Sequence, residues 1–327
     1  MIISRTPYRL SLFGGGTDYP SYYRKYTGEV ISTTINKYVF VTCRYLPNFF
    51  KENIRVSYSK IETVNNIQDI KHPSVLSVLK FLNIKKNIEI HYDGDLPGKS
   101  GLGSSSAFTV GLLNAAYCYK NKKINKNKFD LGLKAIHVEQ NLNKEKVGSQ
   151  DQTAVAVGGF NNIHFKRNGI IQIKKINLKN DFKKKLNRNF LLFSTGKFRT
   201  ANKITKTYVH KLSKKENFFE EIKQITLEAK KIMLSNNKNI NDLGKLMHES
   251  WKLKKSLSDK ISNSFIDDLY DEGIKAGATG GKLLGAGGGG FLLFYVPGSK
   301  NKIKKSLKNL IHVPFKFENE GTKIIYK

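Results

Sequence analysis

A proline, several glycines and three serines stand directly before an apolar stretch in DGDLPGKSGLGSSSAF, residues 93–108. Glycines let a backbone approach an anion closely, because they carry no Cβ. The residues that follow, 104–120, predict a helix that opens on serine caps. Free amides and the dipole at a helix start favour negative charge. The stretch therefore predicts a phosphate-binding loop, and a capped buried helix is the structural alternative.

Two nucleotide-binding motifs are excluded by their context. The Gly98-Lys99-Ser100 triplet resembles the end of a Walker loop, but Asp93 occupies the position of that loop's first glycine. Its carboxylate would face the phosphates. The run GAGGGG, residues 285–290, contains the dinucleotide spacing, yet it leads into the strand-like FLLFYV instead of a helix. We interpret this run as a cleft wall that lets a ligand or another loop come close.

Strand-like and helix-like patterns mix along the chain without strict alternation, which predicts an α+β fold. Residues 28–46 are rich in β-branched and aromatic side chains and indicate paired strands. After Phe190 the apolar spacing becomes helical. We expect two lobes that divide near Asn187, with residues 1–186 in the first and 187–327 in the second. No apolar run reaches 18 residues and no signal peptide is evident, so we expect a cytoplasmic protein without a membrane span.

The net charge is +31, from 57 Lys and Arg against 26 Asp and Glu. The lysines are scattered, and the basic runs lack the interleaved aromatic residues that stack on bases. The charge therefore indicates a solvated surface that also suits anionic substrates, and nucleic-acid binding is the weaker alternative. Cys43 and Cys118 are too few for a disulfide framework.

Three stretches in order resemble the signatures of the GHMP kinases: residues 5–23, 97–106 and 280–294. The resemblance covers essentially the whole chain. Within that superfamily, GGGTDYP, GSQDQ and the stretch from HESWKLKK to GGGGFLLFY are most similar to the D-glycero-D-manno-heptose 7-phosphate kinases. Galactokinases carry Glu-His where Gly15 and Gly16 stand here. The Gly98-Lys99 pair departs from the Pro-Gly expected before the serine, which leaves the stiffness of this loop open.

The resemblance implies a ribosomal-S5-like N-lobe, a ferredoxin-like C-lobe and an active site in the cleft between them. It also implies that ATP, with Mg²⁺, phosphorylates the C1 hydroxyl of D-glycero-D-manno-heptose 7-phosphate. The product would be heptose 1,7-bisphosphate, on the route to GDP-heptose for lipopolysaccharide or capsule. The expected partners are ATP and a sugar phosphate, with no nucleic acid and no membrane; the oligomeric state, including a homodimer, stays open.

Matching positions carry the implied roles. Asp151 is the expected base, and Arg9, with Arg5 as the local alternative, is expected to offset charge near the γ-phosphate. Ser106 and Glu139 are expected to hold Mg²⁺. The expected nucleotide loop comprises Pro97, Gly101, Leu102, Gly103, Ser104, Ser105 and Ser106. The expected substrate residues are Gly15, Gly16, Thr17, Asp18, Lys197, Arg199, Lys282, Gly285, Gly287 and Gly288.

Each role has a structural alternative. Asp151 and Asp18 could be ordinary turn-capping residues, and Glu139 a solvated helix carboxylate. Lys197 and Arg199 follow the strand-like NFLLF and are candidates for a clamp on the distal phosphate, with Lys282 as another. Trp251 is expected to pack in the core. Two other functions remain open: a kinase for a different sugar, such as fucose or an N-acetylhexosamine, and a non-catalytic sensor that binds ATP and sugar.

Overall fold

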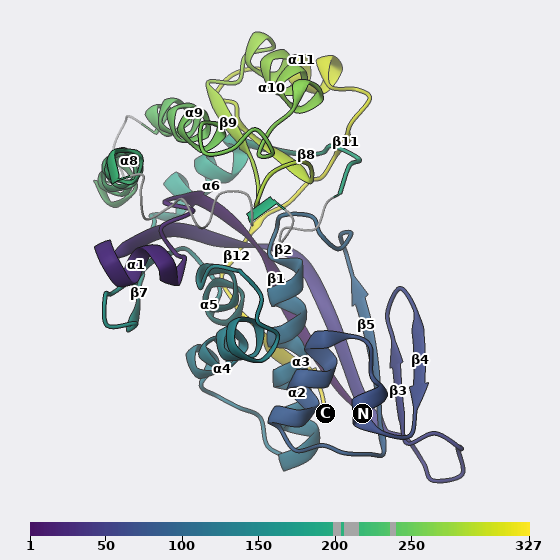
Figure 1. Cartoon of the computed structure of the whole chain (residues 1–327). Helices are drawn as coiled ribbons and strands as arrows, with labels where there is room; N and C mark the ends of the chain where they lie inside the picture. The colour runs from purple at the N-terminus through teal and green to yellow at the C-terminus, as the bar shows by residue number, and fades with distance from the viewer. Residues whose placement is uncertain (199–203, 206–215, 236–239) are drawn as a thin grey trace.

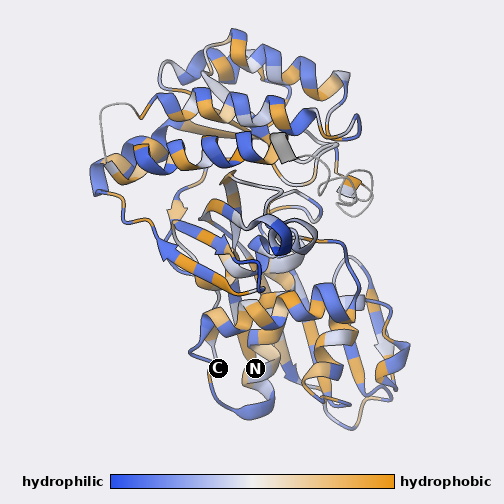
Figure 2. Ribbon diagram, turned by 60° about the vertical axis from the view of Figure 1, so that its left-hand side comes forward, coloured by the Kyte–Doolittle hydropathy of each residue, from blue (hydrophilic) through white to orange (hydrophobic). Residues whose placement is uncertain are grey.

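The computed structural model describes residues 1–198, 204–205, 216–235 and 240–327. Two β-sheets, each covered by helices, lie one above the other in the view of Figure 1. Apolar residues lie on the helix and strand surfaces that face one another, and polar residues lie on the outer faces (Figure 2). The predicted α+β class is confirmed.

The first sheet has nine strands in the part of the chain that is described, with the main order β13-β1-β2-β5-β3-β4. Strand β12 also pairs with β2, and β6 joins β2 to β7. The bounds are β1 (Ile2–Phe13), β2 (Gly28–Tyr45), β3 (Ile54–Ser57), β4 (Ile61–Val64), β5 (Ile88–Gly94), β6 (Asn161–Phe165), β7 (Ile171–Lys175), β12 (Phe317–Glu318) and β13 (Lys323–Tyr326).

The expected pair of strands over residues 28–46 is wrong, because β2 is one strand of 18 residues. Its first part pairs with β6 and its last part with β5, while β1 runs antiparallel along both. The register with β1 shifts between Pro7 and Tyr8. Pairing with the long neighbouring strand β1 keeps residues 28–45 extended as one strand, although the local sequence pattern indicates two.

Helix α3 (Ser104–Asn121) packs against β1 and β2 and is buried on most of its surface. Such an apolar helix is stable only inside a protein. The other helical segments of this half are α1 (Pro20–Tyr26), a 3₁₀ turn (Ile67–Asp69), α2 (Pro73–Phe81), α4 (Lys128–Ile136), a π-helical segment (His137–Leu142), α5 (Gln150–Val157) and α6 (Asn180–Asn189). Helices α2, α3, α4 and α5 cover the same face of the sheet (Figure 1).

The second sheet is antiparallel, in the order β11-β8-β10-β9. Its strands are β8 (Phe190–Ser194), β9 (Gly280–Leu283), β10 (Phe291–Tyr295) and β11 (Ile311–His312). The helices of this half are α8 (Glu216–Ser235), α9 (Asp242–Lys255), α10 (Ser264–Lys275) and α11 (Lys300–Ser306). Trp251 on α9 is fully buried, so its expected packing role is confirmed.

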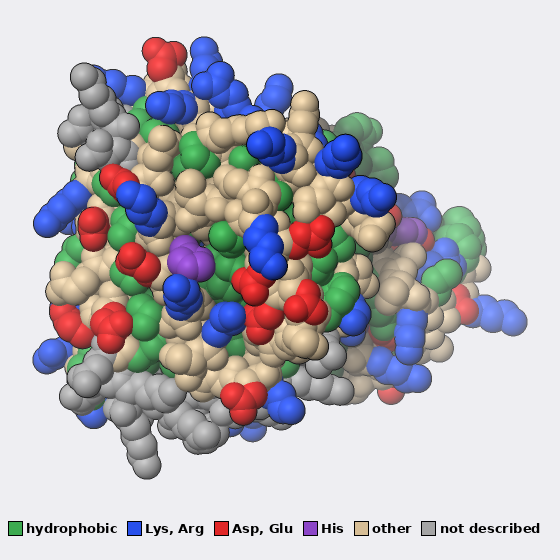
Figure 3. Space-filling view, turned by 90° about the horizontal axis from the view of Figure 1, so that it is seen from above, with side chains coloured by type: hydrophobic (Ala, Val, Ile, Leu, Met, Phe, Trp, Pro, Cys, Tyr) green, Lys and Arg blue, Asp and Glu red, His purple; other side chains and the backbone are tan. Residues whose placement is uncertain are grey.

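The chain returns to the first sheet at its end, where β12 and β13 pair with β2 and β1. The division near Asn187, into residues 1–186 and 187–327, stays a prediction. The face in Figure 3 shows Lys and Arg side chains dispersed among Asp and Glu, without a continuous basic stripe. Among the described residues, no helix combines the length and the apolar content needed to cross a membrane.

Candidate active site

An ion pair between Arg9 on β1 and Asp151 in the first turn of α5 marks the centre of the site. Arg9 Nε donates to Asp151 Oδ1 at 2.8 Å and a terminal nitrogen donates to Oδ2 at 2.7 Å. The other terminal nitrogen donates to Gly101 O at 2.7 Å. The Arg9 side chain is 4% exposed and that of Asp151 25%. The carboxylate is therefore held by a fixed bidentate partner while solvent or a ligand can still reach it.

The glycine-serine loop meets this pair at the start of α3. Gly103 occupies the helix N-cap with φ +75°, and a Cβ there would lie 3.1 Å from Arg9 Cγ. The expected serine cap is wrong: no side chain caps α3, and Ser104 Oγ instead accepts from the Lys99 amide at 3.2 Å. The left-handed cap needs a residue without a side chain. The first amides of α3 consequently open beside Arg9 and Asp151.

The second glycine run supports the phosphate loop from the other lobe. A Cβ on Gly285 would lie 2.4 Å from Gly101 Cα, and one on Gly290 would lie 2.5 Å from Ser100 O. Gly287 packs in the same way on Ile261, and Gly288 N donates to Ile261 O at 2.9 Å. The sequence predicts that a ligand or another loop comes close to these glycines, and in the structure other segments of the chain do so. Direct substrate contacts of Gly285, Gly287 and Gly288 stay a prediction.

Ser106 and Glu139 lie together beneath the start of α3. Ser106 Oγ donates to Glu139 Oε2 at 3.0 Å, and Gln152 Nε2 donates to the same oxygen. Glu139 lies in the π-helical segment, a distortion often found at functional sites, and is 1% exposed. Burial raises the pKa of its carboxyl to about 8, and the nearby Glu145 adds to this rise. Glu139 is therefore not a solvated helix carboxylate.

Four buried oxygens on the segments of the candidate site have no hydrogen-bond partner in the described part of the chain. They are Ser100 Oγ, Glu139 Oε1, Gln150 Oε1 and Gln152 Oε1. Unpaired buried polar atoms are rare in folded proteins because each loses its hydration. Glu139 and Gln152 hydrogen-bond each other through their other polar atoms, so their two unpaired oxygens are consistent with a site that binds a ligand.

Asp18 closes the site from the loop that follows β1. It is 2% exposed, and its Oδ1 accepts from the Gly16 amide at 3.0 Å. The Ser149 amide donates to Asp18 O at 2.9 Å, which brings the GSQDQ segment onto this loop. Gly148 leaves room for the carboxylate, since a Cβ there would lie 1.8 Å from Asp18 Oδ2. The neighbouring Thr17 is also buried, with its hydroxyl bonded to Gly14 O and Glu29 O.

The Asp18 carboxyl should make stability depend on pH. Burial raises its pKa from 3.8 to about 6, helped by repulsion from Asp151. Because folding raises this pKa, the folded protein keeps the carboxyl protonated at pH values where the unfolded chain has already lost the proton. The contribution of Asp18 to the unfolding free energy is therefore fully present below pH 3.8 and is lost as the pH rises through 6. Between pH 5 and pH 8 the unfolding free energy of wild type should fall by about 1–1.5 kcal/mol relative to Asp18→Asn. Urea unfolding measures this; a pH-independent difference between the two proteins would contradict it.

The three expected clamp residues have different positions. The Lys197 side chain is exposed, with its ammonium 3.8 Å from the centre of the Phe265 ring. Its carbonyl accepts from the Gly290 amide at 2.7 Å. Arg199 lies outside the described residues. Lys282 on β9 is 5% exposed and donates to Leu12 O at 3.0 Å.

Sequence reasoning missed Lys254, near the C-terminal end of α9. Its ammonium donates to Gly285 O and, at 3.4 Å, to Leu283 O. Burial and the Arg9 charge lower its pKa to about 8, while the Asp18 charge acts in the opposite direction. In the sequence, Lys254 is one of four lysines between residues 252 and 260, and no local signal separates it from the others.

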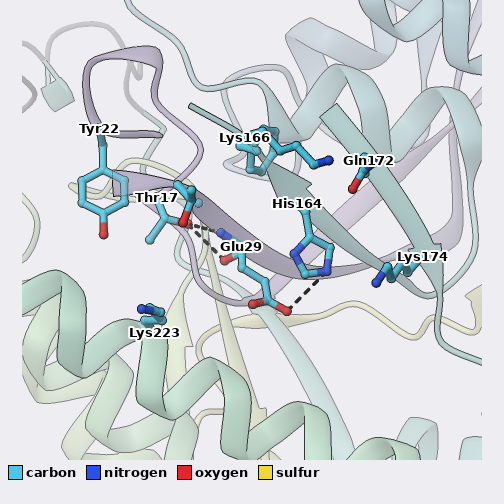
Figure 4. Close-up of a pocket in the computed structure, with 11 residues that line it drawn as sticks. Thr17, Tyr22, Glu29, His164, Lys166, Gln172, Lys174 and Lys223 are labelled. Atoms are coloured by element: carbon cyan, nitrogen blue, oxygen red, sulfur yellow. Dashed lines mark hydrogen bonds and ion pairs between the residues drawn. The ribbon is translucent and has the colours of Figure 1, made fainter. Parts of the chain in front are cut away.

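A pocket beside Thr17 of the 14–18 loop lies between β2, β6, β7 and α8 (Figure 4). Glu29 lies at its base and binds Lys230 Nζ at 2.7 Å. The surrounding Lys166, Lys174 and Lys223 are exposed. On a chain of charge +31, exposed lysines around a pocket are expected without a dedicated ligand. We therefore assign this pocket no function.

Comparison with known proteins matches both halves to family models. Residues 71–159 match the GHMP kinases N terminal domain, and residues 229–312 match the GHMP kinases C terminal domain. The chain is 30% identical to D-glycero-alpha-D-manno-heptose 7-phosphate kinase of Campylobacter jejuni over 98% of both chains. It is 29% identical to mevalonate kinase of Methanocaldococcus jannaschii over 80% of both.

A solved structure from Bacteriodes thetaiotaomicron, described as a D-glycero-D-manno-heptose 1-phosphate kinase, superposes with a TM-score of 0.80. It covers 100% of both chains at 23% identity, so it supports the fold alone. The two heptose kinases differ in the phosphate position that their names give.

The fold, the ordered signatures and these matches place the chain in the GHMP kinase family. It is a phosphotransferase that acts on a sugar hydroxyl, a sugar kinase close to the heptose phosphate kinases. Kinases of this family use ATP.

Proposed function

We propose that this kinase transfers the γ-phosphate of ATP to the C1 hydroxyl of D-glycero-D-manno-heptose 7-phosphate. The observation that carries the proposal is the bidentate Arg9–Asp151 pair beside the open start of α3. The 30% identity to the Campylobacter jejuni heptose 7-phosphate kinase supports the choice of substrate. The product would be heptose 1,7-bisphosphate, and we place this step in the cytoplasm, on the route to GDP-heptose and a surface polysaccharide.

In this proposal Asp151 accepts the proton of the attacking hydroxyl. Its carboxylate oxygens are held in place by Arg9, so no reorganisation is needed when the proton arrives. Arg9 also places positive charge where negative charge develops during phosphoryl transfer. The α3 amides and the loop from Pro97 to Ser106 would hold the nucleotide phosphates. Asp18 would accept hydrogen bonds from sugar hydroxyls.

Ser106 and Glu139 fit a magnesium ion. A hydroxyl and one carboxylate suit Mg²⁺, which keeps several waters and takes its other ligands from phosphates. Glu139 Oε1 is buried without a partner, so the site has an acceptor that a cation can use. When bound, the ion neutralises charge on the phosphates. The two side chains would hold it at the start of α3, where the expected nucleotide loop ends.

Glu139→Gln should raise the Mg²⁺ concentration needed for half-maximal activity at least about tenfold, since even partners of metal ligands contribute that much. The substitution keeps the shape of the side chain and removes its charge. Titration of Mg²⁺ at fixed ATP measures the effect. The matched control is Glu220→Gln, a surface carboxyl on α8 that pairs with Lys223 at 3.4 Å. An unchanged midpoint in the Glu139 variant would place the metal elsewhere.

The substrate is tested by measuring ATP-to-ADP turnover with Mg²⁺ on a panel of sugars. The panel contains D-glycero-D-manno-heptose 7-phosphate, mannose 6-phosphate, fucose, galactose and N-acetylhexosamines. We expect the heptose phosphate to be turned over fastest. Turnover restricted to a neutral sugar would keep the Asp151 chemistry and overturn the substrate. Absence of turnover with every sugar, together with ATP binding, would indicate a sensor.

A further inference from the structure

Two lysines, Lys254 on α9 and Lys282 on β9, turn their ammonium groups onto backbone carbonyls near the candidate site. Lys282 is 5% exposed. Lys254 is partly buried, and its ammonium donates to Gly285 O and Leu283 O. Lysines are almost never fully buried unless they are paired, because removing their charge from water is costly. This pair of lysines therefore calls for an explanation.

In the described part of the chain neither ammonium forms an ion pair, and the Asp18 charge acts on Lys254 only from beyond contact distance. Lys254 donates to Gly285 O and Leu283 O, and Lys282 donates to Leu12 O at 3.0 Å. Among the described residues, no carboxylate lies within 4.0 Å of either nitrogen. Backbone carbonyls carry only partial negative charges, so they do not neutralise an ammonium. An ammonium also has three N–H donors, and these contacts use two of them in Lys254 and one in Lys282. Each lysine thus keeps donor capacity and charge that the described chain leaves unmatched.

Both lysines reach segments that line the active site. Leu12 stands two residues before the 14–18 loop that carries Asp18. Gly285 packs on Gly101, whose carbonyl accepts from Arg9. Burial, together with the charges of Lys254 and Arg9, lowers the pKa of Lys282 to about 7, which agrees with these contacts. The cluster contains three cations, Arg9 included, and Arg9 is already paired with Asp151.

We propose that Lys254 and Lys282 form the subsite for the phosphate group of the sugar substrate. This inference rests on the proposed sugar phosphate kinase function. A phosphate dianion would supply the negative charge that the two ammonium groups lack. A neutral sugar would leave them unmatched.

The position of Lys282 favours the sugar over the nucleotide. The nucleotide phosphates have their own place at the start of α3, where glycines and free amides converge. Lys282 instead contacts the end of β1, next to the loop expected to bind the sugar. Lys197, expected to be a clamp, is exposed, so water can solvate its ammonium without an anion.

The test uses Lys254→Met and Lys282→Met, which keep an unbranched stem and remove the charge. The KM for the sugar phosphate should rise about 30-fold or more in each variant, the usual loss when one partner of a desolvated charge pair is removed. The dissociation constant for ATP should stay within about threefold of wild type, a change below 1 kcal/mol. Circular dichroism and thermal unfolding check that each variant folds.

The matched control is Lys255→Met, the adjacent residue on α9. Lys255 Nζ binds Asp267 at 2.9 Å, on the α10 side of the helix. This control should keep both the sugar phosphate KM and the ATP affinity of wild type.

A binding measurement separates this proposal from the choice of sugar. Mannose 6-phosphate and mannose are titrated calorimetrically into protein saturated with Mg²⁺ and a non-hydrolysable ATP analogue, which fills the nucleotide site. We expect wild type and Lys255→Met to bind the phosphorylated sugar more tightly, and both lysine variants to lose that preference. Wild type could prefer mannose 6-phosphate over mannose, and the lysine variants lose that preference, while no sugar phosphate is phosphorylated. The proposed kinase function would then be wrong, and the phosphate subsite would be supported.

Three results would overturn the subsite. Wild type could bind mannose 6-phosphate no better than mannose. The variants could weaken ATP binding and leave the sugar phosphate unaffected, which would assign the lysines to the nucleotide. Folded variants could keep both affinities, which would make the lysines structural links between backbone carbonyls.

Discussion

Asp151→Asn should lower kcat about 10²–10⁴-fold, the usual contribution of a positioned general base. Asparagine keeps the size of the side chain and one acceptor for Arg9, but it cannot take the hydroxyl proton. Because Asp151 would act on the sugar hydroxyl and not on the nucleotide, the affinity for ATP should change little. Steady-state formation of ADP and equilibrium binding of ATP measure the two quantities separately.

The control for this variant is Asp130→Asn. Asp130 lies on α4 and pairs with Lys134 at 2.7 Å on the surface, with 37% of its side chain exposed. It should retain wild-type kinetics. If Asp151→Asn kept full turnover in a folded protein, the carboxylate would not be the base and its contact with Arg9 would be structural.

Arg9→Met should affect both activity and stability. The guanidinium makes two hydrogen bonds to Asp151 and one to Gly101 O, so its removal frees the carboxylate and the phosphate loop together. We expect kcat to fall about 10²–10³-fold, as for other preorganised donors. The unfolding free energy should fall by about 2–3 kcal/mol, below the full cost of breaking a buried pair because Asp151 keeps partial exposure.

Arg5→Met is the matched control on the same strand. Arg5 pairs with Glu320 at 3.4 Å, and its side chain is 25% exposed, compared with 4% for Arg9. Because exposed ion pairs contribute little, its stability should change by less than about 1 kcal/mol. The Arg9→Met/Asp151→Asn double variant should lose less activity than the product of the single losses, because the residues act as one unit. Independent effects would show that the pair is not a catalytic unit.

The glycine turn before α3 was predictable because its signals are local. Glycine adopts the positive φ of Gly101 and Gly103 most readily, and a Cβ on Gly101 would lie 2.4 Å from Leu284 O. The cap itself was misassigned: serine is the commoner N-cap residue, but here the left-handed turn places Gly103 at the cap. The long strand β2 was missed for a related reason. Its continuity depends on β1, a partner that local sequence does not include.

The order and composition of the motifs identified the family, the α+β class and candidates such as Asp151, Arg9, Glu139 and Ser106. These inferences need only residue identity and short spacing. The tertiary structure decided which candidates meet. Arg9 and Asp151 are 142 residues apart in sequence, and their contact exists only because β1 and α5 pack in the same lobe.

Tertiary structure also decided what approaches the second glycine run, namely the backbone of Gly101 and Ser100. It distinguished Lys254 from the adjacent Lys255, because the Lys254 ammonium donates to Gly285 O and Leu283 O while Lys255 pairs with Asp267. The sequence determines which backbone conformations each residue can adopt and which chemical groups its side chain carries. Burial, charge pairing and contact depend on distances between segments far apart in the chain, and folding sets those distances.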